Sequence, residues 1–141
     1  MSGRKERFAD WMDGMDTVLD EFMADLPDEV SDKLDYSLES LDVLEAWFVD
    51  RYASTKELRA DDDVRPWDGA TRYYGQVLVK QLGGRWADAP EGPPQIRGIG
   101  LGDDGPPIIP MLLVSSTLAR RTGTQLRTVA ENNLKAQQAR G

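Results

Sequence analysis

The apolar residues of segment 37–52 recur at intervals of three and four positions, which places them on one face of a helix. This apolar stripe consists of Leu38, Leu41, Leu44, Phe48 and Tyr52, and Val43 and Trp47 widen it. Ser37 is a good N-cap for this helix, with Ser40 three positions further on. An arc this wide indicates contact with more than one neighbouring element, so we expect the rest of the chain to pack around this helix.

Two further segments have helical periodicity. Residues 4–26 predict one helix that ends before Pro27, because the residue before a proline disfavours the helical region. Its methionine-rich stripe is Phe8, Trp11, Met12, Met15, Leu19, Phe22, Met23 and Leu26. Residues 66–82 predict another helix, with Pro66 in its first turn and Gly83-Gly84 as its stop. The polar segment 53–66 between the second and third helices is predicted to be a loop.

The composition changes after Gly84, where short strand-like segments are separated by glycine and proline. Residues 85–87, 95–101 and 107–109 predict strands, with a loop over 88–94 and a turn at Asp103-Asp104-Gly105. Residues 111–121 and 124–137 predict the last two helices, and the tail from Lys135 to Gly141 is expected to fray. The predicted fold is therefore α+β and mainly helical. Residues 1–141 form a single domain, in which a small antiparallel sheet of two or three short strands (85–109) lies between the third and fourth helices.

The sequence contains no histidine and no cysteine. Their absence excludes thiol chemistry, cysteine-ligated metals and the most common general base. No apolar run approaches the roughly 20 residues that a membrane-spanning helix needs. Acidic residues interrupt the segment after Arg4, Lys5 and Arg7, so it does not resemble a secretory signal. We therefore expect a cytoplasmic protein, and an enzyme is the less favoured class.

The formal net charge of −8 is unevenly distributed. Residues 1–63 hold 19 acidic and 7 basic side chains, whereas residues 64–141 hold 6 acidic and 10 basic ones. An acidic surface repels phosphates, which argues against nucleic acid as a partner and favours a basic protein or a cation. The alternative is a solvated acidic face that keeps the protein soluble.

Three motifs suggest chemistry but lack the pattern that it requires. Asp61-Asp62-Asp63 offers oxygen ligands for a cation, but the pattern of an EF-hand is absent, and the alternative is a surface loop in which Asp63 caps the next helix. The glycines of segment 98–102 do not have dinucleotide-binding spacing. The carboxylate pairs Glu39 with Glu45 and Glu21 with Asp25 lie along helices, without evidence of a cleft between them. The sequence therefore predicts no metal site, no cofactor and no catalytic residue.

The best candidate for a binding site is a group of aromatic and polar side chains near the expected contact of the third helix with the sheet. The candidate residues are Tyr73, Gln76, Arg85 and Trp86, with Glu39 from the central helix. Arg85 follows the glycine stop, where it is placed to meet a carboxylate of the central helix. Such a group forms either a binding hot spot or a structural ion pair that locks the helix to the sheet.

Two blocks of the sequence, residues 34–41 (LDYSLESL) and residues 74–86 (YGQVLVKQLGGRW), together resemble a group of small bacterial proteins of unknown function, of the kind common in actinomycetes. That group has an LDxSxxSL block, a GE…GGxW block and a proline-containing segment, which Ile109-Pro110 matches here. The resemblance covers roughly residues 34–115 and implies a shared fold without implying a reaction. Gln76 stands where the group has Glu, so a function of that Glu does not carry over to this chain.

These observations favour a non-catalytic protein-binding module with an acidic face, for example an immunity or adaptor-type protein, by analogy with other small acidic proteins. The alternative is a small-ligand binder or weak enzyme with a pocket between the third helix and the sheet. A further alternative is a homodimer that buries the methionine-rich or the central stripe.

Overall fold

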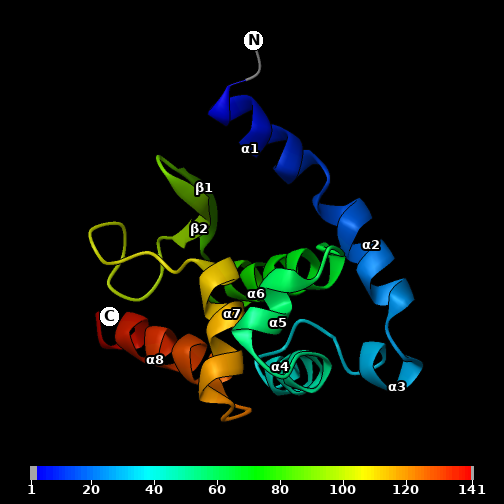
Figure 1. The fold of residues 1–141 in the computed structure, drawn as a ribbon. Coiled ribbons are helices and arrows are strands. Elements are labelled where there is room, and N and C mark those ends of the chain that lie inside the picture. Colours follow the sequence, from blue (N-terminus) through cyan, green and yellow to red (C-terminus); the bar gives the residue numbers. More distant parts are fainter. Residues whose placement is uncertain (1–2, 141) are drawn as a thin grey trace.

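The chain has an α+β fold in a computed structural model that describes residues 3–140 (Figure 1). The elements in chain order are α1 (Arg4–Asp13), α2 (Met15–Asp25), α3 (Asp28–Ser31), α4 (Ser40–Arg51), α5 (Thr55–Ala60), α6 (Arg65–Leu82), β1 (Arg85–Ala89), β2 (Gly92–Arg97), α7 (Pro110–Arg120) and α8 (Gln125–Arg140). The predicted fold class is confirmed: the chain is mainly helical, with a two-stranded antiparallel sheet between α6 and α7 in sequence. In the described part of the chain, no helix is both long enough and apolar enough to cross a bilayer.

Helix α6 lies at the centre of the molecule, where it contacts α2, α4, α7, α8 and both strands (Figure 1). Its predicted bounds are correct to one residue, and Gly83 ends it in the left-handed conformation at φ 77°. Gly69 and Gly75 have no room for a methyl group, because a Cβ there would collide with the rings of Phe22 and Trp86. Gly69 and Gly75 therefore let aromatic side chains reach the backbone of α6.

The predicted helix 4–26 is in fact two helices, and Gly14 separates them. Gly14 has φ −83° and ψ 0°, and glycine stabilises a helix about 1 kcal/mol less than alanine does. The break gives the two halves different partners. The ring of Trp11 in α1 contacts the ring of Trp86, with 4.8 Å between the ring centroids, whereas Phe22 in α2 packs against Gly69.

The central helix begins at Ser40, three residues later than predicted. The hydroxyl of Ser37 accepts a hydrogen bond from the backbone N–H of Ser40 at 3.1 Å, but Ser37 is not the N-cap as predicted, because that position is Glu39, whose side chain makes no capping bond. Tyr36 has a positive φ of 64°, and its backbone N–H donates to the hydroxyl of Tyr73 at 2.9 Å. The backbone N–H of Ser40 donates to the carbonyl of Ser37 at 3.2 Å and that of Leu41 donates to Leu38 at 3.1 Å, so residues 37–39 form tighter turns before the α-helix begins. The predicted loop 53–66 contains the short helix α5, whose first turn is capped by Ser54.

The hairpin pairs the first two predicted strands, in a register that the sequence did not determine. Strands β1 and β2 pair directly, with Trp86 opposite Ile96, so the turn falls at residues 90–91 within the predicted loop. Pro93 and Pro94 lie where the register shifts between Ala87 and Ala89. Proline is tolerated there because an interrupted ladder does not require its missing N–H. The predicted third strand is reduced to a single bridge between Ile96 and Ile108.

The C-terminal helices complete the core against α4 and α6. Helix α8 continues to Arg140, beyond the predicted end at residue 137, and the last residue of the predicted fraying tail lies outside the described residues. Helix α8 is joined to the central helix by Glu45, whose carboxylate accepts hydrogen bonds from the backbone N–H groups of Gln125 and Leu126 at 3.1 and 2.8 Å. Glu45 is only 1% exposed, so this cap is part of the core.

Candidate functional site

A series of exposed carboxylates runs along α1, α2 and α3, which succeed one another along one edge of the molecule (Figure 1). Residues 6–35 contain eleven acidic and two basic side chains. We call the eleven acidic residues the acidic face: Glu6, Asp10, Asp13, Asp16, Asp20, Glu21, Asp25, Asp28, Glu29, Asp32 and Asp35, all exposed. Among the residues that the structure describes, none of them makes an ion pair. Their charges are therefore left to solvent or to a partner.

The electrostatic effect of the acidic face extends into the neighbouring elements. The pKa of Tyr36 is raised mainly by burial and then by the negative charges of Asp16 and Asp20. The pKa of Arg65 is raised mainly by its bonds to Asp63, with contributions from Asp25 and Glu21. The carboxylates of α2 thus act on side chains that belong to the central part of the fold.

A cleft of about 290 Å³ lies between α2, α4 and the start of α6. We call it the α2–α4 cleft; it is lined by Val18, Glu21, Phe22, Asp25, Leu26, Trp47, Arg51, Asp63, Arg65 and Pro66. The apolar part is formed by buried side chains with the half-buried Trp47, whose ring meets that of Phe22 edge-on at 5.5 Å. Glu21 and Asp25 of the acidic face border the cleft on the α2 side, so the two features are continuous.

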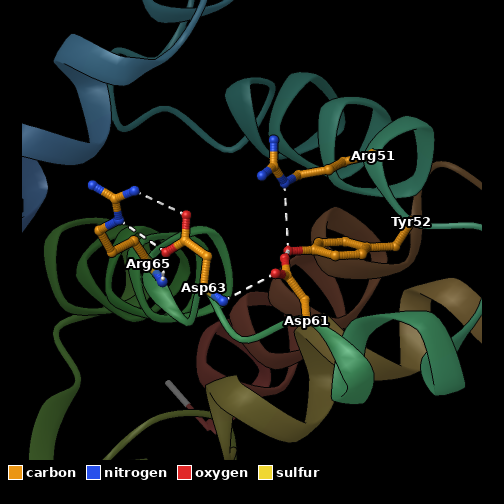
Figure 2. Close-up of polar contacts among 5 residues, drawn as sticks. All are labelled: Arg51, Tyr52, Asp61, Asp63 and Arg65. Carbon is orange, nitrogen blue, oxygen red and sulfur yellow. Dashed lines mark hydrogen bonds and ion pairs between the residues drawn. The ribbon is translucent and has the colours of Figure 1, made fainter.

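Figure 2 shows the charged network on the opposite side of the cleft. Arg65 binds both carboxylate oxygens of Asp63, at 2.8 and 3.0 Å. Tyr52 donates to Asp61 at 2.7 Å, and the Nε of Arg51 donates to the hydroxyl of Tyr52 at 3.4 Å. These contacts hold the two arginines on either side of the segment from Asp61 to Asp63.

The pKa values of this network follow from its hydrogen bonds. The pKa of Asp63 is lowered to about 2, first by the side-chain bond from Arg65 and then by its backbone N–H. The pKa of Asp61 is lowered, first by the hydroxyl of Tyr52. Burial is the main cause of the raised pKa of Tyr52, and the bond to Asp61 adds to it. The carboxylates therefore stay charged near neutral pH.

The aspartates of this segment have structural partners. Asp63 accepts a bond from the backbone N–H of Arg65 at 3.1 Å, but it does not cap the next helix as expected, because the N-cap position of α6 is Val64. Asp61 accepts the corresponding bond from the N–H of Asp63 at 3.0 Å. Over residues 3–140, no group of three acidic side chains is placed to hold a metal ion.

The five predicted site residues lie in three different places. Tyr73 is fully buried and bonds the hydroxyl of Ser40 at 2.7 Å, at the start of the central helix, where Glu39 is exposed. Gln76 and Trp86 do meet, because the indole N–H donates to the Gln76 amide oxygen at 2.8 Å. The ring of Trp86 fills the contact between α6 and the hairpin.

Arg85 is separate from that contact. Its guanidinium lies 2.7 Å from Asp103, in the loop after β2, and not beside a carboxylate of the central helix as expected. The side chains are 58% and 68% exposed, so solvent screens this ion pair. The structure therefore brings together Gln76 and Trp86, and does not bring Arg85, Tyr73 and Glu39 to them.

The burial of two charged residues, Glu45 and Arg72, was not predicted from the sequence. Glu45 lies four positions after Leu41 and three before Phe48, so its place on the apolar stripe was visible in the sequence. Arg72 lies 4.1 Å from the centre of the Trp11 ring and binds Asp68 one turn earlier. The spacing of four between Asp68 and Arg72 was visible, but the contact with α1 was not.

Comparisons of the chain with protein-family models, with curated proteins and with solved structures find no match. The resemblance of residues 34–115 to small actinomycete proteins therefore stays a prediction. The features that bear on function are the acidic face and the α2–α4 cleft that it borders.

Proposed function

We propose that this protein is a non-catalytic binding module for a basic protein, which docks on the acidic face. The observation that carries the proposal is the series of eleven exposed carboxylates on α1–α3 and the segment that follows α3, none in an ion pair within the described residues. Like charges held this close repel one another, and a basic surface relieves that repulsion. Complementary charge also accelerates association and selects against acidic partners.

The rest of the chain supports a directed interaction. Residues 64–141 carry more basic than acidic side chains, so the field of the molecule is polarised. A basic protein is drawn towards α1–α3 and away from the C-terminal half. An immunity-type or adaptor-type role fits such a module, by analogy with other small acidic binding proteins.

The two alternatives have less support. A small-ligand pocket between α6 and the hairpin would have to share its space with the indole of Trp86, which packs against Gly75 and Trp11. A homodimer that buries the central stripe is not favoured, because Leu41 and Leu44 of that stripe are already fully buried within the chain and would gain no further burial.

The proposal is tested by capture on the tagged protein from its native host at low salt, followed by mass spectrometry. We expect a stoichiometric basic protein that is released as the salt concentration rises. The variant D16N/D20N/D28N removes three charges from the acidic face, and the matched variant E91Q/D104N/E131Q removes three exposed charges elsewhere. Capture is expected to be lost only in the first variant. Equal capture by both variants, or the absence of a stoichiometric basic protein, refutes the proposal.

A further inference from the structure

The size of the α2–α4 cleft matches one inserted side chain. Its volume is about 290 Å³. Pockets for small-molecule ligands typically span about 300–1,000 Å³, and a cavity of about 150 Å³ already holds a benzene ring. Protein interfaces often depend on a single large side chain that fills a pocket of one partner. The cleft is therefore the right size for an anchor of this kind.

The chemistry of the lining favours a long cationic side chain. Phe22, Leu26 and Trp47 offer an apolar surface to an aliphatic stem. Glu21 and Asp25 are four positions apart on α2, which places both carboxylates on the same side of the helix. Neither makes an ion pair in the described part of the chain, so both remain available to a cation.

The two arginines of the cleft do not reverse this preference. Arg65 is neutralised by its two bonds to Asp63, and Arg51 is held by Tyr52, with its guanidinium 5.9 Å from the centre of the Trp47 ring. The lining holds three carboxylates against two guanidinium groups. An anionic ligand would have to approach those three carboxylates, whereas a cation meets Glu21 and Asp25, which make no ion pair among the described residues.

We propose that the α2–α4 cleft is the anchor pocket for one arginine side chain of the basic partner, an inference that rests on the proposed function. The stem lies against Trp47 and Phe22, and the guanidinium binds Glu21 and Asp25. Arginine fits better than lysine because its planar group stacks on aromatic rings and binds carboxylates through two parallel hydrogen bonds.

The pocket is tested on the whole protein by nuclear magnetic resonance, with the indole N–H of Trp47 as the reporter. The probe is N-acetyl-arginine methylamide, compared with the norleucine and glutamate analogues, which are neutral and anionic. We expect a saturable shift of the Trp47 resonance with the arginine probe alone, with a dissociation constant on the order of 1–10 mM, as for a single-residue fragment. No saturable shift, an equal shift with norleucine, or a stronger one with glutamate overturns the assignment.

Substitution of the two carboxylates locates the bound cation. The variant E21Q/D25N is expected to weaken the arginine probe about tenfold, which is the loss of one charge-assisted hydrogen bond. The matched variant E91Q/D104N should bind the probe like the wild type. Both pairs are exposed, so the backbone spectrum should report an intact fold in each. Unchanged binding by E21Q/D25N overturns the proposal.

The anchor pocket and the proposed function can fail separately. The variant D16N/D20N/D28N leaves the lining of the cleft unchanged. If this variant loses the basic partner but the arginine probe does not bind the wild type, the acidic face binds without an anchor and only the pocket is refuted. If the probe binds but D16N/D20N/D28N captures the partner as well as the wild type does, the proposed function is refuted.

Discussion

Replacement of Glu45 by glutamine removes the buried charge that joins α4 to α8. In the wild type, one carboxylate oxygen accepts from the N–H of Leu126 at 2.8 Å and the other from Gln125 at 3.1 Å. Glutamine retains one acceptor and turns an NH₂ group towards the other N–H donor. The N-terminus of α8 then loses one hydrogen bond and the favourable interaction of a negative charge with its dipole.

The magnitude of this effect follows from the burial of the contact. A hydrogen bond to a charged group contributes about 1.5–3 kcal/mol, and a charge at a partly buried helix end contributes up to about 2 kcal/mol. Relief of the desolvation of the buried charge offsets part of the loss. We expect E45Q to lower the free energy of unfolding by about 3 kcal/mol, which corresponds to a fall in Tm of about 9 °C for a chain of this size.

Equilibrium unfolding in urea checks this value. The matched control is E39Q, which makes the same chemical change at an exposed position just before the same helix. That variant should stay within about 0.5 kcal/mol of the wild type, as most surface substitutions do. If E45Q also stays within about 0.5 kcal/mol, the carboxylate does not stabilise α8, and the reasoning is refuted.

Two further changes test the packing of α6 and the network beside the cleft. G75A should destabilise the fold by about 1–3 kcal/mol in urea unfolding despite its better helix propensity, because the added methyl collides with the ring of Trp86. G14A, whose Cβ would meet only ordinary contacts, should be neutral or stabilising, and equal effects of the two would contradict the account. Carbon-detected titration should give Asp63 a pKa of about 2, and R65Q should return it towards the ordinary value of about 3.9. The pKa of Asp63 is lower in the folded than in the unfolded chain, so the stability that the Asp63–Arg65 pair contributes is present above about pH 4 and is lost as the pH falls through about 2. An ordinary pKa for Asp63 in the folded protein would contradict this prediction.

Local sequence rules predict well those helices that begin at a proline and end at a glycine. Pro66 and Gly83-Gly84 delimit α6 to within one residue. The break at Gly14 was missed because the apolar spacing of residues 4–26 continues across it, and only the different partners of α1 and α2 reveal it. Both strands of the hairpin extend further into the predicted loop than expected, because Pro93 and Pro94 argue against a strand unless the register shift at these residues is known.

The site was less predictable than the fold because its parts are distant in the sequence. Glu21 and Asp25 meet Trp47 and Arg65 only after α2, α4 and α6 have packed together, and no local pattern encodes that contact. The uneven charge of the chain was visible in the sequence, whereas its continuity with a cleft was not. The pairing of Gln76 with Trp86 depends in turn on the register of the hairpin.

The most direct test of the central claim is the salt dependence of the dissociation constant for the recovered basic partner. The account predicts that the wild-type affinity falls steeply as the salt concentration rises, and that D16N/D20N/D28N weakens binding at low salt and flattens that dependence. E91Q/D104N/E131Q should retain the wild-type behaviour. An affinity that is indifferent to salt, or equal in both variants, would contradict a docking surface on α1–α3.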